Sequence, residues 1–135
     1  MDFELTTSWN PALNEKIEGQ IKGFLEQKTG IYHVFKPGAI YVYQDSALIG
    51  GAIFEIQGRS LWVDSLWINI QFQRQGIATR LIKQLSEFAQ EQECEFLQLN
   101  TYFGQTFFQK VGFEVMAMIP KWKYGLNCYF MRKAL

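Results

Sequence analysis

The residues best suited to chemistry lie in Gln73–Thr79, where an apolar run gives way to a helical pattern. Exposed backbone amides at the start of a helix form an anion site, and the helix dipole adds to their attraction for negative charge. Gly76 has no side chain, so a pyrophosphate could approach the main chain closely there. Ala78 is also small, and Arg74 and Arg80 supply positive charge. The segment therefore predicts a phosphate-binding turn.

This turn differs from two common phosphate-binding motifs. It lacks the Gly-Lys-Ser/Thr ending of a P-loop, and it lacks the three glycines of a dinucleotide fingerprint. A polar loop that binds nothing is the alternative, because glycine makes up ~7% of average sequences and short patterns arise by chance. The position of the turn, between a long apolar strand and an amphipathic helix, favours the anion site.

Patterns on both sides of the turn predict the elements that position it. Ile77, Leu81 and Leu85 recur at helical spacing within an expected helix over 76–93. Upstream, turns at Asp45-Ser46 and Gln57-Gly58-Arg59 separate three strands of an antiparallel meander. The expected strands are Ala39–Gln44, Leu48–Gln57 and Ser60–Ile70.

The remaining segments complete one α/β domain over residues 1–135. Asn10-Pro11 begins an amphipathic helix that ends near Gly30, and a loop is expected at Lys36-Pro37-Gly38. A strand after the 76–93 helix forms a strand–helix–strand crossover, which favours a parallel pair. The later elements are a strand at Phe96–Asn100, a helix at Thr106–Val111, and strands at Glu114–Ile119 and Asn127–Arg132. The predicted fold is a central mixed, mostly antiparallel sheet flanked by helices.

Composition excludes several classes of protein. Lys+Arg and Asp+Glu number 13 each, so the basic surplus of a nucleic-acid binder is absent. Cys94 and Cys128 are read as free thiols, and the one histidine, His33, excludes a histidine-rich metal site. The first ten residues lack signal-peptide features, and no apolar run reaches the ~20 residues that span a bilayer. A cytoplasmic protein without a metal, nucleic-acid or membrane partner is expected.

Two separated motifs resemble a known family. Gln73-Arg74-Gln75-Gly76-Ile77-Ala78 resembles the Gln/Arg-x-x-Gly-x-Gly/Ala signature of the GNAT superfamily of acyl-CoA N-acyltransferases. Phe107-Phe108-Gln109-Lys110-Val111-Gly112-Phe113 is similar to the family's Phe-Tyr-x-Lys-x-Gly-Phe segment. The ending Gly125–Leu135 is similar to the last strand of small bacterial-type members, so the likeness covers nearly the whole chain. The resemblance implies that the turn holds the pyrophosphate of acetyl-CoA.

The resemblance also implies a set of residues that bind this cosubstrate. In the family, the fourth and fifth strands splay apart around the pantetheine arm, and here they would be Ser60–Ile70 and Phe96–Asn100. Main-chain groups near Leu66–Ile68 would bond the pantetheine and the acyl carbonyl. Asn100 would bond the pantetheine amides or cap the next turn. The implied set is Leu66, Trp67, Ile68, Gln73, Arg74, Gln75, Gly76, Ile77, Ala78, Thr79, Asn100 and Phe108.

An acidic residue is expected to act as the base. An amine must lose its proton before it attacks a thioester, directly or through water. Asp64 lies about where family members often place an acidic residue, and Glu55 is a second candidate. The alternative for Asp64 is a carboxylate that holds a loop or an arginine.

The source of the leaving-group proton departs from the family. Many members use the tyrosine of the Phe-Tyr-x-Lys segment, but Phe108 stands there and has no proton to give. Tyr102 and Tyr129 are the candidate replacements, with Tyr124 or a water as further alternatives. Trp62 and Trp67 are read as packing groups that an unbulged strand would direct to opposite faces.

The implied reaction is acetyl transfer from acetyl-CoA to a primary amine, by direct attack in a ternary complex. The acceptor is a small-molecule or peptide amine that the sequence does not name, and a homodimer would be unsurprising for so small a member. Phe108 supports a first alternative, a CoA-binding sensor or interaction module that has lost catalysis. The second alternative is a structural interaction domain in which the glycine turn holds nothing.

Overall fold

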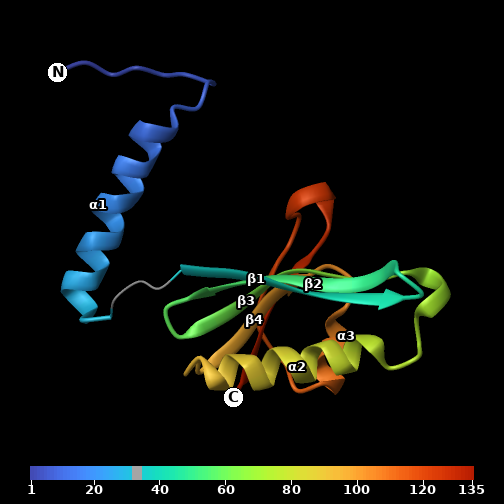
Figure 1. Cartoon of the computed structure of the whole chain (residues 1–135). Helices are drawn as coiled ribbons and strands as arrows, with labels where there is room; N and C mark the ends of the chain where they lie inside the picture. The colour runs from blue at the N-terminus through green and yellow to red at the C-terminus, as the bar shows by residue number, and fades with distance from the viewer. Residues whose placement is uncertain (32–34) are drawn as a thin grey trace. The chain divides into compact units, whose positions relative to one another are not determined.

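The chain consists of two compact units, and each is treated by itself. The computed structural model describes residues 1–31 and 35–135 (Figure 1). The first unit is Met1–His33 and the second is Val34–Leu135. His33, the one histidine of the sequence, lies outside the described residues.

The first unit contains one helix, α1 (Pro11–Thr29), with the ends that the sequence predicts. The Asn10 side chain accepts a hydrogen bond from the Leu13 amide at 3.2 Å, which satisfies one of the free amides of the first turn. Gly30 ends the helix with a left-handed backbone, φ 70°.

The second unit contains a six-stranded sheet in the order β1-β2-β3-β4-β6-β5. Its strands are β1 (Phe35–Gln44), β2 (Ala47–Gln57), β3 (Ser60–Ile68), β4 (Phe96–Thr101), β5 (Glu114–Ile119) and β6 (Cys128–Ala134). The helices are α2 (Ile77–Glu91) and α3 (Gln105–Lys110), with short 3-10 turns at Ile70–Phe72 and Lys123–Gly125. β3 and β4 are parallel, whereas every other neighbouring pair is antiparallel. The mixed, mostly antiparallel sheet is confirmed.

Two expected boundaries are wrong. Lys36-Pro37-Gly38 belongs to β1 rather than to a loop. β1 is an edge strand, where a proline is tolerated, and a Cβ on Gly38 would lie 2.4 Å from the Phe54 ring. The strand expected to reach Ile70 stops at Ile68, because the Asn69 side chain accepts from the Gln71 amide at 2.9 Å and begins a 3-10 turn.

The core lies between the sheet and α2, which runs along one face of it (Figure 1). Leu61, Leu85 and Leu97 are each 0% exposed. Burying one leucine side chain contributes about 1.5–3 kcal/mol to the stability of the fold. The burial of these three leucines in one cluster therefore holds α2 against the sheet. α3 packs against the same cluster through Phe108. The helix that follows the glycine turn is therefore held firmly on the sheet.

A β-bulge interrupts β3 at Asp64. Phe54 of β2 pairs with Val63, and Ile53 pairs with Ser65, which leaves Asp64 as the extra residue. The bulge shifts the alternation of side chains along the rest of the strand. Trp62 and Trp67 therefore pair with Glu55 and Gly51, two residues that share one face of β2. The two tryptophans lie on the same face, and the expectation for an unbulged strand does not apply.

Candidate active site

The sheet opens between β3 and β4. The parallel ladder joins Ser60–Val63 to Phe96–Leu99 and stops there. β3 continues against β2 as far as Ile68, and β4 continues against β6 as far as Thr101. The ends of the two strands thus diverge while each keeps its outer partner. This is the splay expected of the strands that the family numbers four and five.

Asp64 lies where the splay begins. It is the bulged residue, it is exposed, and it directly follows the last β3 residue that pairs with β4. Among the described residues, the ion pairs are Arg59–Glu95 and Lys83–Glu87, so no arginine holds this carboxylate. Glu55, the second candidate base, accepts a hydrogen bond from the Gln57 side chain.

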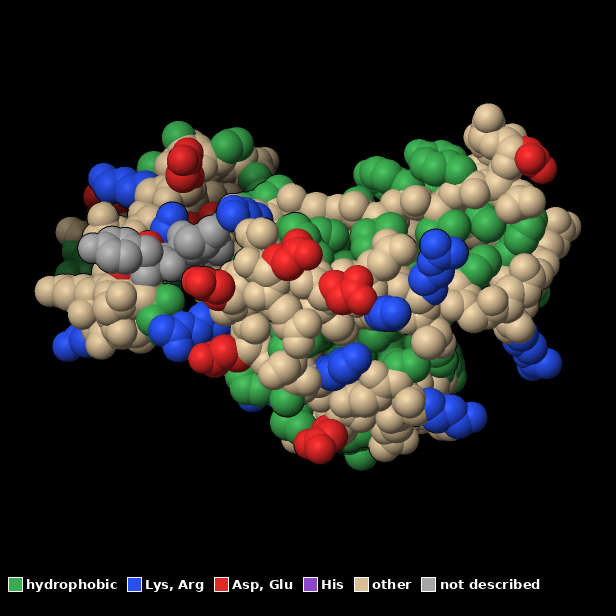
Figure 2. Space-filling model, turned by 60° about the horizontal axis from the view of Figure 1, so that its bottom comes forward, with side chains coloured by type: hydrophobic (Ala, Val, Ile, Leu, Met, Phe, Trp, Pro, Cys, Tyr) green, Lys and Arg blue, Asp and Glu red, His purple; other side chains and the backbone are tan. Residues whose placement is uncertain are grey.

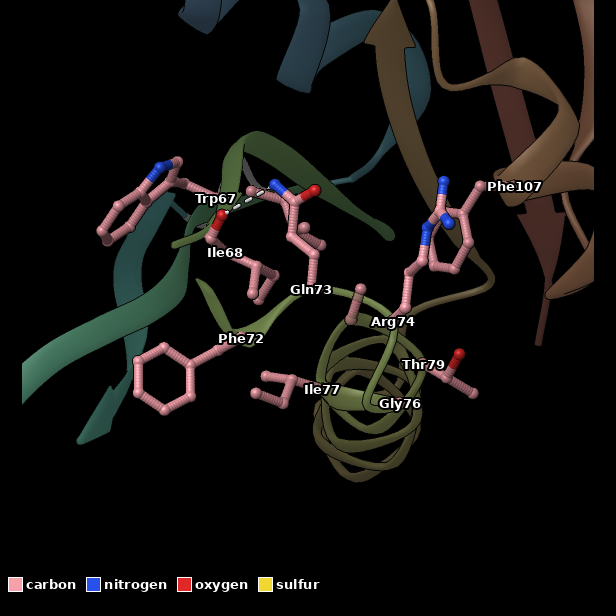
Figure 3. A pocket seen from close by; sticks show the side chains of 11 residues that line it. Trp67, Ile68, Phe72, Gln73, Arg74, Gly76, Ile77, Thr79 and Phe107 are labelled. Atoms are coloured by element: carbon pink, nitrogen blue, oxygen red, sulfur yellow. Dashed lines mark hydrogen bonds between the residues drawn. The ribbon is translucent and has the colours of Figure 1, made fainter. Parts of the chain in front are cut away.

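A hollow of about 520 Å³ lies beside the splay, between the end of β3 and the start of α2 (Figure 3). Most of the residues expected to bind acetyl-CoA line it, and so do two that are not in the expected set. The expected ones are Leu66, Trp67, Ile68, Gln73, Arg74, Gly76, Ile77, Ala78 and Thr79, and the added ones are Phe72 and Phe107.

The start of α2 leaves backbone donors for a ligand. The first bond within the helix runs from the Arg80 amide to the Gly76 carbonyl at 3.0 Å, so the amides of Ile77–Thr79 lie ahead of it. No side chain caps this end of α2. Gly76 has φ +80°, and a Cβ built there would meet no atom within 4 Å. Open space in front of uncapped amides fits a pyrophosphate group.

Hydrogen bonds hold the turn in place. The Gln73 side-chain amide donates to the Ile68 carbonyl at 3.1 Å, which the dashed line in Figure 3 marks. The Asn69 amide donates to the Ile49 carbonyl at 2.7 Å. Arg74 has φ +63°, a left-handed conformation that is uncommon for a residue with a side chain. The surrounding bonds keep this strained residue at the edge of the hollow.

Three residues of the expected set do not line the hollow. Phe108 packs against the core and contacts the rings of Phe107 and Phe113, with centroids 5.1 and 5.5 Å away. Gln75 is exposed within the turn. Asn100 follows Leu99, the last β4 residue that pairs with β3, and therefore lies at the splay. The two adjacent phenylalanines of α3, Phe107 and Phe108, indicated that this helix borders the acetyl-CoA site. The sequence alone could not show which of the two rings lines the hollow.

The two candidate acids lie at the open end of β4. Tyr129 pairs with Thr101 and packs against the core, and Tyr102 follows directly after β4. The Tyr102 ring contacts the Tyr124 ring edge-on, with centroids 6.1 Å apart. Desolvation raises the pKa of the Tyr102 hydroxyl above its ordinary value, and the neighbouring Cys128 thiol and Tyr124 hydroxyl raise it further. A tyrosine hydroxyl is protonated at neutral pH in any case, and the shift makes Tyr102 a weaker acid than an ordinary tyrosine.

Within residues 1–31 and 35–135, no group of three or more His, Cys, Asp or Glu side chains could hold a metal ion. None of the helices described is long and apolar enough to cross a membrane. Acidic and basic side chains are interspersed on the face that Figure 2 shows.

Comparison with known proteins gives a consistent result. A family model described as an acetyltransferase (GNAT) domain matches residues 36–115. The blasticidin-S acetyltransferase of Streptomyces morookaense is 32% identical over 91 residues, covering 65% of this chain and 67% of that protein.

Solved structures share the fold at low sequence identity. An acetyltransferase from Bacillus cereus ATCC 14579 superposes with a TM-score of 0.85 at 17% identity, over 98% of each chain. The ribosomal-protein-S18-alanine N-acetyltransferase of Escherichia coli superposes with a TM-score of 0.67 at 14% identity, over 73% of this chain and 68% of that one. The family model and the match to the blasticidin-S acetyltransferase show that the chain belongs to the GNAT acetyltransferase family and is an acyltransferase.

Proposed function

We propose that the protein transfers an acetyl group from acetyl-CoA to a primary amine by direct attack in a ternary complex. One observation carries the proposal: the hollow at the uncapped start of α2 continues onto Leu66–Ile68, the β3 edge that the splay leaves unpaired with β4. Phosphates held at the turn would place a pantetheine arm against this edge. No metal and no covalent enzyme intermediate is needed.

The main chain of β3 stabilises the charge that develops during transfer. As the amine nitrogen bonds to the thioester carbon, negative charge grows on the carbonyl oxygen. Amides near Leu66–Ile68 border the hollow and supply hydrogen-bond donors for that oxygen. These donors belong to a strand that β2 holds as far as Ile68, so they need little reorganisation.

Asp64 and Tyr102 handle the protons. Asp64 takes a proton from the attacking amine, directly or through a water, because its exposed carboxylate lies at the mouth of the splay. Tyr102 protonates the sulfur as the carbon–sulfur bond breaks, because its hydroxyl, like that of any tyrosine, is protonated at neutral pH and it directly follows β4 at the open end of the strand. Tyr129 is the second candidate for this step.

Turnover tests the proposal. Purified protein is incubated with acetyl-CoA and a panel of primary amines, and release of the CoA thiol is followed with a chromogenic reagent. Blasticidin S belongs in the panel because a relative is named for its acetylation. We expect amine-dependent thiol release together with an acetylated amine detected by mass spectrometry. Thiol release without acetylated amine would contradict the proposal.

One observation favours a second function, a CoA-binding sensor or interaction module. Phe108, at the position where many family members carry a tyrosine, is a core-packing residue and cannot donate a proton. Introducing the hydroxyl with Phe108→Tyr separates the two functions. A large gain in turnover from an inactive protein would support the sensor, whereas activity already present in the wild type would exclude it.

A further inference from the structure

The turn between β5 and β6 holds an aromatic residue in a strained backbone conformation. Tyr124 has φ 62° and ψ 17°, in the left-handed region that residues with side chains rarely adopt. Such strain persists only where the surrounding structure enforces it, and it is concentrated at functional sites. We propose that Tyr124 is a positioning residue whose ring orients the Tyr102 side chain for proton transfer to the CoA sulfur. The inference rests on the proposed acetyl transfer and adds a residue to its acid step.

Main-chain hydrogen bonds enforce the strained conformation. The Trp122 amide donates to the Leu126 carbonyl at 2.8 Å, and the Gly125 amide donates to the Trp122 carbonyl at 3.2 Å. Both bonds close the turn around Tyr124. The Trp122 ring packs edge-on against the Phe130 ring of β6, with centroids 6.0 Å apart, and joins the turn to the sheet. The place of Tyr124 is therefore set by the fold and not by the conformational preference of a tyrosine.

The main chain that carries Tyr102 is also held. Thr101, the last residue of β4, pairs with Tyr129. The Thr101 hydroxyl accepts a hydrogen bond from the Gly104 amide at 2.8 Å, which fixes the turn that follows the strand. Among the described residues, Tyr124 is the one whose ring contacts the Tyr102 ring, edge-on with centroids 6.1 Å apart. This contact limits the directions in which the Tyr102 ring can point.

The acid step needs such a limit. Continuing the β4–β6 register by one residue places Tyr102 opposite Cys128, the first residue of β6, so Tyr102 is flanked by this strand and by the turn before it. The Tyr102 hydroxyl gives its proton to the sulfur as the carbon–sulfur bond breaks, and the phenolate that remains takes a proton from water. An acid held in a productive orientation reacts faster than one that samples many orientations.

Kinetics with acetyl-CoA and blasticidin S, or with the amine of the panel that the wild type acetylates fastest, test the inference. Tyr124→Gly removes the ring and relieves the left-handed strain. We expect kcat to fall by about 2- to 10-fold, the rate equivalent of one aromatic pair, with the KM of each substrate little changed. Tyr124→Phe retains the ring and should retain the wild-type kcat. A loss of kcat in Tyr124→Phe would overturn the inference, because the hydroxyl and not the ring would be required.

Lys121→Gly is the matched control. Lys121 lies in the same turn and has φ 52°, but its side chain has no ring to place against Tyr102. The substitution relieves the same kind of strain, so both glycine variants should melt at similar temperatures. Lys121→Gly should leave kcat unchanged, and equal kcat values in Tyr124→Gly and Lys121→Gly would overturn the inference.

A double variant shows whether Tyr124 acts through Tyr102. In the Tyr102→Phe background, Tyr124→Gly should cause no further loss of kcat, because the hydroxyl that it orients is absent. A further loss as large as the one in the wild-type background would overturn the inference. Unchanged kcat in Tyr102→Phe alone would overturn the acid step together with the inference. Failure of the wild type to acetylate any amine would instead overturn the proposed function.

Crystal structures of the variants test the inference without turnover. We expect one conformer of the Tyr102 side chain in the wild type, in Tyr124→Phe and in Lys121→Gly. Tyr124→Gly should show more than one, because the contact that limits the ring is removed. A single conformer at the wild-type position in Tyr124→Gly would overturn the inference whatever the kinetics show.

Discussion

At the scale of single residues, Gly76 combines two properties that the glycine turn requires. Its φ of +80° is a conformation that residues with side chains rarely adopt, and the space in front of it is open. A side chain there would meet no protein atom but would occupy the position of a bound phosphate. Gly58, in the turn between β2 and β3, shares the positive φ and the open space at the end of β3 away from the hollow.

These two glycines make a matched pair of variants. We predict that Gly76→Trp raises the Kd of acetyl-CoA by at least about 10-fold, equivalent to about 1.4 kcal/mol. Gly58→Trp has the same backbone strain and should leave this Kd unchanged, while both variants melt at a similarly lowered temperature. Calorimetric titration and thermal denaturation measure the two effects. Equal acetyl-CoA affinity in the two folded variants would contradict the location of the phosphate site.

Asp64 is the residue on which the proposed mechanism depends most. We predict that Asp64→Asn lowers kcat by about 10²- to 10⁴-fold, the range typical of a lost general base. The acetyl-CoA Kd should stay near that of the wild type, because Asp64 does not line the cofactor hollow. Glu55→Gln serves as the control and should retain most of the activity. Full turnover by Asp64→Asn would mean that the base lies elsewhere.

At the scale of elements, the bulge in β3 and the loop before α2 form the site together. The bulge places Asp64 at the end of the β3–β4 ladder, and the loop returns the chain to the start of α2. Gln73 connects the two, since its side chain bonds the Ile68 carbonyl. The end of β3 and the phosphate turn are thus coupled through one side-chain hydrogen bond.

The Gln73 bond yields a third prediction. Gln73→Leu removes the donor to the Ile68 carbonyl and should lower the free energy of unfolding by about 1 kcal/mol, the usual net value of one hydrogen bond. It should also weaken acetyl-CoA binding, because the turn loses its connection to β3. Gln71→Leu is the control, since only the main-chain amide of Gln71 is bonded among the described contacts. Urea denaturation and acetyl-CoA titration would test both variants, and identical results for the two would contradict this role.

The sequence predicted the elements better than their details. Local signals are strong at α1, where Asn10 and Gly30 mark both ends, and at the Asp45-Ser46 turn, whose residues both have positive φ. The bulge was not predicted from the sequence. In the structure it shows in the burial of β3, where the buried side chains switch from odd-numbered positions up to Val63 to the even-numbered Ile68. A bulge depends on pairing with β2, and pairing is a long-range property. The packing of α3 against the sheet is also a long-range property, so the sequence could not show that Phe108 faces the core and Phe107 the hollow.

At the scale of the whole molecule, both cysteines lie within packed structure. Cys94 and Cys128 are free thiols with 7% and 1% exposure. Desolvation raises the pKa of each thiol above its ordinary value, and the charge of Lys123 partly opposes this shift at Cys128. Because the thiolate is the nucleophile, buried and protonated thiols are unreactive.

Stability should therefore fall at alkaline pH. Thiols of the unfolded chain ionise near pH 8.5, whereas those of the folded protein ionise at higher pH. Between these values the unfolded chain has released protons that the folded protein retains, so rising pH favours unfolding. We predict that the free energy of unfolding declines as the pH rises above about 8.5. A decline equally large in the Cys94→Ala, Cys128→Ala double variant would contradict the assignment to these thiols.

The most direct measurement is a calorimetric titration of the wild-type protein with acetyl-CoA, with dephospho-CoA and ATP as comparison ligands. The glycine turn, the uncapped start of α2 and the splayed strands predict saturable binding at one site, strongest for acetyl-CoA. Absence of binding by a well-folded sample would contradict the assignment of this site and would mean that the family fold persists here without its cosubstrate.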